Sequence, residues 1–273
     1  MAANVVVWNM QSQTGPENWD RLLNWGPIAN AGLYLLCEAV PAPKHIEDSL
    51  MVEMNGSSKE TGCQCGPGKC DYPGRQFSTA VAAPRGVEFE PLPFEPEVRA
   101  GTWVACRVDL GGIPVTSIAL YGLTDEAYPT YWQSTEKAIS EVMPILEHAE
   151  YGKHVLLGGD WNILAGSPPN SSHGVLTGLE DFGLVDCLKA KLPADRYDDP
   201  VRRKEMDNCR CGKGPDCTHT RTFYDKRRPT IPYQDDYLFA SEGLADLLTR
   251  CSAEPLDENS PSDHAPIVAE FNI

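Results

Sequence analysis

Residues 154–162 read His-Val-Leu-Leu-Gly-Gly-Asp-Trp-Asn, a short apolar run followed by a polar end. The apolar run predicts a buried strand, and the polar end places Asp160 and Asn162 where a side chain can leave the sheet and enter a cleft. Four further polar clusters adjoin predicted strands in this way: Trp8-Asn9-Met10-Gln11, Leu36-Cys37-Glu38, Asp235-Asp236-Tyr237 and Ser262-Asp263-His264. Together these clusters form a candidate site.

The predicted strands are spread along the whole chain. Short apolar runs predict strands at 5–8, 33–36, 79–83, 103–108, 116–121, 154–157, 237–240 and 267–271. Helical spacing of apolar residues predicts helices over 18–25 and 136–148, with Ser134 or Thr135 placed to cap the second. This interleaving favours an α/β or α+β sandwich, in which helices cover the outer faces of packed sheets.

The length of 273 residues, 41% of them hydrophobic, is enough for a sizeable core. We expect a single domain over 1–273, interrupted by long loops at 41–74 and 193–232, with Cys-containing insertions around 41–74 and 193–221. No apolar run reaches the roughly 18 to 20 residues that a membrane span needs, and no signal-like apolar segment follows Met1. We therefore expect a cytoplasmic protein with no membrane partner.

The charge is unevenly distributed. The chain carries 23 basic and 39 acidic residues, a net charge of −16, which argues against non-specific coating of nucleic acid. Residues 196–228 hold ten basic and six acidic residues, so this stretch is +4 and the rest −20. An acidic enzyme that reaches phosphates through a metal ion and a local basic patch fits this pattern. The candidate phosphate-binding cations are Arg202, Arg203, Lys204, Arg210, Lys213 and Arg221. The alternative is a solvated loop.

Carboxylates and amides at strand ends are suitable ligands for a hard divalent cation. Mg²⁺ takes oxygen ligands and usually needs only one or two protein carboxylates. Glu38 and Asp263 can supply these to Mg²⁺ or Mn²⁺. Each cluster alone has a simpler interpretation, with Glu38 a surface acid and Asp160 and Asn162 turn residues. Their order along the chain favours the site.

In that order the motifs resemble the endonuclease/exonuclease/phosphatase superfamily, the metal-dependent phosphodiesterases that include DNase I-like nucleases. The matching positions span nearly the whole chain: Asn9, Glu38, the strand at 77–85, Tyr121, Gly159-Asp160-Trp161-Asn162, Thr222-Phe223-Tyr224, Asp236-Tyr237 and Ser262-Asp263-His264. The resemblance implies a four-layer α/β sandwich, two packed mixed sheets flanked by helices, with the site at the strand-end rim.

The resemblance also implies how a phosphate would be bound. Glu38 would hold Mg²⁺ against it, and Asp263 would complete the ligands of the metal. Tyr121 would donate its phenolic hydrogen bond to the phosphate, which needs no change of ionisation at neutral pH.

Proton transfer falls to a second group of residues. The resemblance implies that Asp160 orients or deprotonates the attacking water, while Asn9 and Asn162 fix the carboxylate and the phosphate. His264, paired to Asp236, would be the acid–base and electrostatic partner. The sequence leaves open whether Asp160 or His264 is the general base.

The first forty residues resemble one branch more closely. Trp8-Asn9-Met10-Gln11, then Trp19 in a Leu-rich helix and Glu38-Ala39, are similar to the catalytic subunit of cytolethal distending toxins. Two positions depart from other branches. Gln11 stands where abasic-site endonucleases have Asp, and Tyr121 where DNase I-like enzymes have His.

Six of the ten cysteines fall in two clusters that share the pattern Cys-x-Cys-Gly-x-Gly. The clusters are Cys63, Cys65 and Cys70, and then Cys209, Cys211 and Cys217 with His219. Three thiolates and an imidazole suit a tetrahedral structural zinc ion, and the two clusters could also share metal. Disulfides or free, redox-active thiols are the alternatives.

These observations predict a Mg²⁺-dependent phosphodiester hydrolase, a nuclease with DNA or RNA as its partner. Two alternatives stay open. One is a phosphomonoesterase or small phosphodiester hydrolase of the same superfamily, because substrate choice depends on the loops. The other is a catalytically inactive, zinc-stapled binding module. The sequence does not indicate an oligomeric state.

Overall fold

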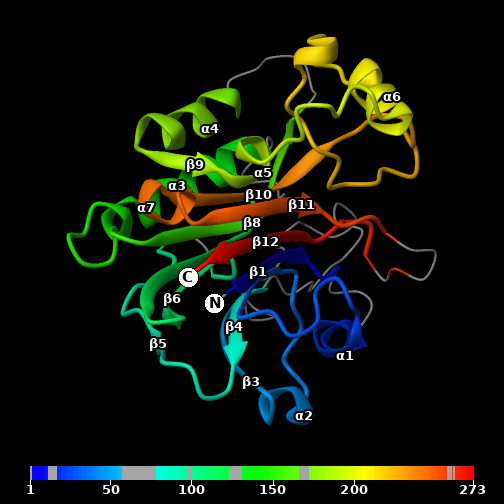
Figure 1. Ribbon diagram of the computed structural model, residues 1–273. Helices are drawn as coiled ribbons and strands as arrows, with labels where there is room; N and C mark the ends of the chain where they lie inside the picture. Colours follow the sequence, from blue (N-terminus) through cyan, green and yellow to red (C-terminus); the bar gives the residue numbers. More distant parts are fainter. Residues whose placement is uncertain are drawn as a thin grey trace, which may run out of the picture.

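The computed structural model describes residues 2–11, 17–56, 78–97, 100–122, 131–165, 172–256, 260 and 262–273. Two six-stranded sheets pack against each other, and helices lie on their outer sides (Figure 1). The expected α/β sandwich of two packed mixed sheets flanked by helices is therefore confirmed.

The first sheet joins the two ends of the described chain. Its strand order is β11 (Leu248–Ala253), β12 (Ile267–Asn272), β1 (Ala2–Asn9), β2 (Leu33–Cys37), β4 (Ser78–Pro84) and β3 (Leu50–Gly56). β1 and β2 are parallel and the other pairs antiparallel. Ala2 lies opposite Asn272, so the N- and C-terminal strands are neighbours.

The second sheet contains the strand that carries Asp160 and Asn162. Its order is β5 (Phe89–Pro91), β6 (Trp103–Leu110), β7 (Ile113–Leu120), β8 (Val155–Ala165), β10 (Gln234–Ser241) and β9 (Leu184–Asp186). β7 and β8 are parallel, whereas β8 and β10 are antiparallel with Asp160 opposite Asp236. This register sets two carboxylates side by side.

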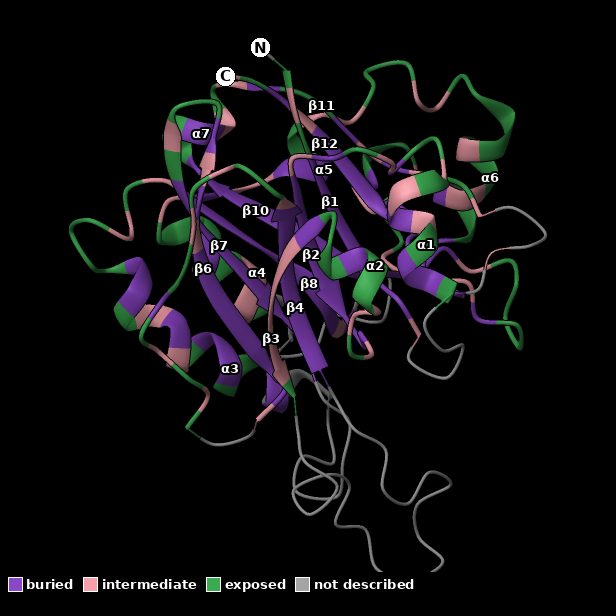
Figure 2. Cartoon of the chain, turned by 90° about the horizontal axis from the view of Figure 1, so that it is seen from below, coloured by how far each residue is buried: buried purple, intermediate pink, exposed green. Residues whose placement is uncertain are grey.

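Alternation along the central strands builds two apolar layers. In β1, Val5 and Val7 pack between the sheets, while Val6 and Trp8 pack on the outer side with Trp19 of α1. Successive strand side chains point to opposite faces, so a strand covered on both sides is apolar throughout. Figure 2 shows these buried strands in purple at the centre of the molecule.

Helices cover the outer faces. They are α1 (Glu17–Asn24), α2 (Lys44–Glu47), α3 (Tyr131–Leu146), α4 (Ser172–Asp181), α5 (Cys187–Ala190), α6 (Pro200–Asn208), α7 (Glu242–Ala245) and a 3₁₀ turn, Gly214–Asp216. α1 packs on the first sheet, and α3 packs on the second through Ile139 and Val142. None of the helices in the described ranges is long and apolar enough to cross a membrane.

Three local predictions are wrong. α3 begins at Tyr131, so Ser134 and Thr135 lie inside it instead of capping it, and Thr135 donates a hydrogen bond to the Trp161 carbonyl. The predicted loop at 41–74 contains α2 and β3 within 44–56, because alternating apolar residues there pair with β4. The loop at 193–232 contains α6, whose start is fixed by Asp199, which accepts hydrogen bonds from the backbone of Val201 and Arg202.

Gly159 allows β8 to approach its neighbours at the site. Its φ is +149°, and a Cβ there would lie 1.9 Å from the Leu120 carbonyl oxygen and 2.9 Å from Cys37 Sγ. The next backbone N–H, of Asp160, donates to Cys37 Sγ at 3.3 Å. Only glycine fits both the conformation and the space, so this residue sets the position of Asp160.

We predict that Gly159→Ala costs about 3 kcal/mol or more of unfolding free energy, because backbone must move to admit the methyl group. Thermal and denaturant melts measure the loss. The matched control is Gly174→Ala in α4, where an added Cβ meets nothing within 4 Å. That control should leave stability unchanged or raise it by up to about 1 kcal/mol. Equal melting temperatures for Gly159→Ala and wild type would contradict the close packing.

Candidate active site

The strand ends bring residues from both sheets to one rim. β1 and β2 are parallel and end together, so Asn9 and Glu38 are adjacent, with Asn9 Nδ2 3.4 Å from Glu38 Oε1. The same Nδ2 donates to Asp160 Oδ2 at 2.7 Å, across the sandwich. Asn9 and Asp160 are each 1% exposed. One amide therefore ties the carboxylate of the second sheet to the first sheet.

His264 completes the cluster. Its Nδ1 lies 2.8 Å from Asp236 Oδ2, and its Nε2 is 3.9 Å from Asp160 Oδ2 and 3.9 Å from Asp263 Oδ1. Ser262 holds this turn, because its hydroxyl donates to the Asn9 carbonyl at 2.7 Å and accepts from the His264 N–H at 3.1 Å. The ring is oriented by Asp236, and Nε2 faces Asp160.

Asn162 fixes the other side of the carboxylate. Its backbone N–H donates to Asp160 Oδ1 at 3.0 Å, and its Nδ2 donates to the Gly122 carbonyl at 2.7 Å. Gln11, Glu38 and Asn162 all have φ near +50°. Left-handed backbone at non-glycine residues is uncommon and concentrates at functional sites.

Tyr121 also lies in the cluster, beside Glu38. Its hydroxyl donates to Glu38 Oε1 at 2.7 Å. In the structure this hydroxyl orients the carboxylate that is the candidate metal ligand, and the hydrogen bond to a phosphate that the resemblance implies stays a prediction.

Burial shifts the pKa values of the central pair. It raises the pKa of Asp160 to about 7, although His264 acts in the opposite direction. For His264, burial alone would lower the pKa, but the carboxylates of Asp236 and Asp160 outweigh it and raise the pKa well above 6.5. The two pKa shifts therefore favour the protonated, hydrogen-bond-donating form of His264 beside a carboxyl group whose pKa is about 7.

The donor set fits a hard divalent cation. Asp160 and Asp236 each offer a carboxylate oxygen, and these oxygens lie within 4.8 Å of one another and of a His264 ring nitrogen. Asp236 Oδ1 and Asp235 Oδ1 are buried and have no hydrogen-bond partner among the described residues. Glu38 and Asp263 stand at the two sides of this cluster. Clustered carboxylate oxygens with unused lone pairs are suitable ligands for Mg²⁺ or Mn²⁺.

A cavity of about 360 Å³ adjoins His264. Its lining residues are Asn162, Phe223, Asp225, Arg227, Arg228, Tyr233, Asp235 and His264. Arg227 and Arg228 were not among the predicted site residues, and Asp235 belonged to the predicted cluster 235–237 but had no predicted role. The two arginines carried only a charge signal shared by the whole basic stretch, and Asp235 enters the cavity where the β8–β10 register shifts between Gln234 and Asp236.

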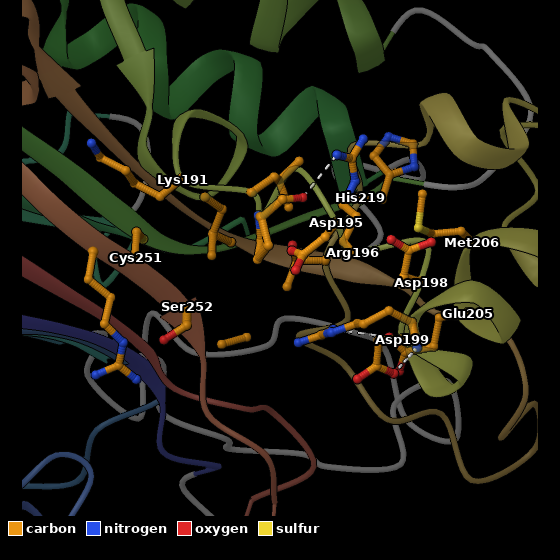
Figure 3. A pocket seen from close by; sticks show the side chains of 17 residues that line it. Lys191, Asp195, Arg196, Asp198, Asp199, Glu205, Met206, His219, Cys251 and Ser252 are labelled. Atoms are coloured by element: carbon orange, nitrogen blue, oxygen red, sulfur yellow. Dashed lines mark hydrogen bonds and ion pairs between the residues drawn. The ribbon is translucent and has the colours of Figure 1, made fainter.

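The cations selected from the sequence have contacts within their own loop. Arg202 pairs with Glu205 at 3.0 Å, the Arg203 guanidinium lies 5.3 Å from the Tyr197 ring centre, and Arg221 lies 4.1 Å from that of Tyr224. Lys204, Arg210 and Lys213 are exposed. Arg202 lines a second cavity, of about 460 Å³, which shares none of its described lining residues with the first (Figure 3).

The second cysteine cluster is gathered in space. Cys209, Cys211, Cys217 and His219 each offer a ligand atom, and these lie within 4.8 Å of one another. Cys63, Cys65 and Cys70 lie outside the described residues.

Comparison with known proteins gives a structural answer only. No protein-family profile matches the sequence, and no curated protein matches it. The described architecture is that of the DNase I-like endonuclease/exonuclease/phosphatase fold.

Solved structures share this fold over their full length. An AP endonuclease from Archaeoglobus fulgidus has 17% identity and a TM-score of 0.64, covering 99% of this chain and 100% of its own. The 3′ phosphatase NExo from Neisseria, bound to a product DNA hairpin, has 18% identity, a TM-score of 0.61 and coverage of 99% and 100%. A humanized D. rerio TDP2 has 15% identity and a TM-score of 0.61, and the match covers 100% of this chain and 99% of its own. The narrower resemblance to the toxin subunit is not shown.

Asp235 provides a pH test of the site. Burial and the nearby Asp160 charge raise its pKa well above 3.8. A carboxyl group with a higher pKa folded than unfolded destabilises the fold increasingly as the pH rises above the unfolded value. Asp235→Asn should therefore raise the melting temperature at pH 8 in EDTA, by roughly 2 to 4 °C per kcal/mol gained.

This gain should disappear as the pH falls towards 4, and differential scanning calorimetry across that range measures it. The exposed Asp246→Asn serves as the control and should show no pH-dependent gain. A lower melting temperature for Asp235→Asn at pH 8 would mean that the ionised carboxylate stabilises the protein.

Proposed function

We propose that this protein is a Mg²⁺-dependent phosphodiesterase that cleaves nucleic acid. The observation that carries the proposal is the meeting of two oriented pairs, Asn9 with Asp160 and Asp236 with His264, at 2.7 and 2.8 Å. His264 Nε2 and Asp160 Oδ2 lie 3.9 Å apart. Two groups that can transfer protons therefore face each other at the rim. A binding module needs no such pair.

Asp160 is the general base in this proposal. Asn9 and the Asn162 backbone N–H each donate to one of its oxygens, which fixes the carboxylate. Its pKa of about 7 suits a group that accepts a proton from water near neutral pH. Phosphodiester hydrolysis needs such a group beside the attacking water, and the water must lie opposite the leaving oxygen.

His264 is the charged donor. With Nδ1 held by Asp236, Nε2–H is directed to the side where negative charge develops on the phosphate. Its raised pKa makes it a poor base at neutral pH, which supports the assignment of the base to Asp160.

Mg²⁺ would be held by Glu38 and Asp263. When bound, it supplies Lewis-acid stabilisation of the phosphate oxygens. Tyr121 and Asn9 contact Glu38 and orient it for that role.

Nucleic acid is the preferred substrate because Arg227 and Arg228 line the cavity beside His264. These cations give an otherwise acidic chain a local site for backbone phosphates. The solved neighbours support this choice, since one is described as an AP endonuclease and another was solved with a product DNA hairpin.

The function is tested with supercoiled plasmid, single-stranded RNA and a 3′-phosphorylated oligonucleotide. We expect strand cleavage with Mg²⁺, loss in EDTA and recovery with excess Mg²⁺. Asp160→Asn and His264→Ala should each reduce the rate at least about 100-fold. His45→Ala, an exposed histidine paired with Asp20, is the matched control and should keep full activity. Release of the terminal phosphate alone would replace the nuclease with a phosphomonoesterase, and inactivity on all three would leave the binding module.

The position of the phosphate-binding cations is a separate prediction. Arg227→Ala/Arg228→Ala should lower kcat/KM roughly tenfold, because charge-assisted hydrogen bonds to phosphate are lost. The slope of log affinity against log salt should fall by about 0.9 for each lost contact to duplex DNA. The control Arg202→Ala/Arg203→Ala/Lys204→Ala, on α6, should change neither. If only the α6 variant lost affinity, the cations that bind the phosphates would lie on α6.

A further inference from the structure

We propose that Cys209, Cys211, Cys217 and His219 bind one zinc ion, and that this ion anchors the segment 220–224, which supports the Asp236–His264 pair. The proposal concerns a site separate from the catalytic cluster. It does not rest on the proposed function, because it is tested by metal content and by backbone protection.

The backbone of this loop turns back so that four ligands converge. Cys209 follows α6, and its N–H donates to the Met206 carbonyl. Gly212, with φ +71°, then reverses the chain, and the 3₁₀ turn Gly214–Asp216 returns it to Cys217, whose N–H donates to the Gly214 carbonyl at 3.0 Å. A glycine is needed at this reversal because of its positive φ.

The donor atoms are spaced for one small ion. Cys209 Sγ lies 3.2 Å from His219 Nδ1, and the four ligand atoms lie within 4.8 Å of one another. A tetrahedral zinc ion, with Zn–S of about 2.3 Å and Zn–N of about 2.0 Å, holds its ligands roughly 3.5 to 3.8 Å apart. Small rotations of the side chains close the difference. Three thiolates and one imidazole are a structural zinc ligand set.

Apolar packing alone gives this loop little support. The local cluster of buried apolar side chains consists of Met206, Cys209 and Cys217, with Tyr197 and Cys211 packed against it. α6 is mostly exposed, including Val201 at 69%. On its other side the loop borders the cavity of about 460 Å³ that His219 and Met206 help to line (Figure 3). A zinc ion would replace the missing core, since metal binding contributes directly to folding.

The segment after His219 is connected to the catalytic pair through its backbone. The Thr220 N–H donates to Gln234 Oε1 at 3.0 Å. Two residues on, Thr222 Oγ1 accepts from the backbone N–H groups of Asp235 and Asp236, at 2.9 and 3.0 Å. The start of β10 is therefore held by this segment.

The same segment also holds the His264 turn. The Thr222 carbonyl accepts from the Ala265 N–H at 2.7 Å, and the Tyr224 N–H donates to the Asp263 carbonyl at 2.9 Å. The Phe223 ring lies 4.9 Å from the His264 ring. An anchor at His219 thus limits the movement of both members of the catalytic pair, and His219 and Thr222 are positioning residues.

Metal analysis of the full chain under reducing conditions tests the site. We expect His219→Ala and Cys211→Ser each to contain one zinc ion per chain fewer than wild type. His219→Cys preserves four ligands and should keep the ion, with a changed cobalt absorption spectrum after substitution by Co²⁺. Cys251→Ala, which removes a buried thiol outside the cluster, should keep wild-type zinc.

Two results would overturn the zinc assignment. One is unchanged zinc content in His219→Ala and Cys211→Ser. The other is a mass corresponding to a Cys209–Cys217 disulfide in protein purified without reductant. Any zinc bound by residues 63–70 would be present in wild type and in every variant, so it does not affect the difference in zinc content between them.

Hydrogen exchange tests the anchoring. Loss of zinc in His219→Ala should speed exchange of the amides of 220–224 and of Asp235 and Asp236, but not those of β1. The zinc-retaining His219→Cys should restore protection. Unchanged exchange in a zinc-free His219→Ala would show that the metal does not support the catalytic pair.

Discussion

The pairing of β8 with β10 in one register is the constraint on which the site depends. It places Asp160 opposite Asp236 inside the protein, where two like charges are costly. The cost is offset by an imidazolium between them and by the Asn9 amide from the other sheet. A slip of one residue would turn these side chains to opposite faces. The packing of the sheets and the turn at Ser262 can therefore be understood as support for one buried charge cluster.

Much of the fold could be predicted because its central strands are covered on both faces. Such strands are apolar throughout, and 33–36 and 154–157 could be recognised from composition alone. Edge strands could not. β11 carries Thr249 and Arg250 on its exposed side, and β9 has only three residues. β3 lay within a segment rich in turn residues, where its pairing with β4, and not its own propensity, decides the structure.

The rim residues could be predicted because strand ends are where polar side chains follow apolar runs. Asn9, Glu38 and Asp160 obey this rule, whereas His264 precedes its strand, and the structure brings all four together. The cavity wall could not be predicted, since Arg227 and Arg228 carry the same charge as Arg202 and Arg203 of α6, and only the fold places the first pair beside His264. When two segments carry similar charge, nothing in their local sequence indicates which of them the fold brings close to the site.

The neighbouring positions of the first and last strands have a consequence for biosynthesis. β1 is synthesised well before its partner β12, because residues paired between the two strands, such as Val7 and Ile267, lie far apart in the chain. Its edge stays open until β12 is available, and contacts of such high sequence separation form slowly. Ser262 and His264, which complete the rim, directly precede β12 and are synthesised just before it. A nascent chain that has not yet reached residue 264 therefore lacks the Asp236–His264 pair, and its rim is incomplete.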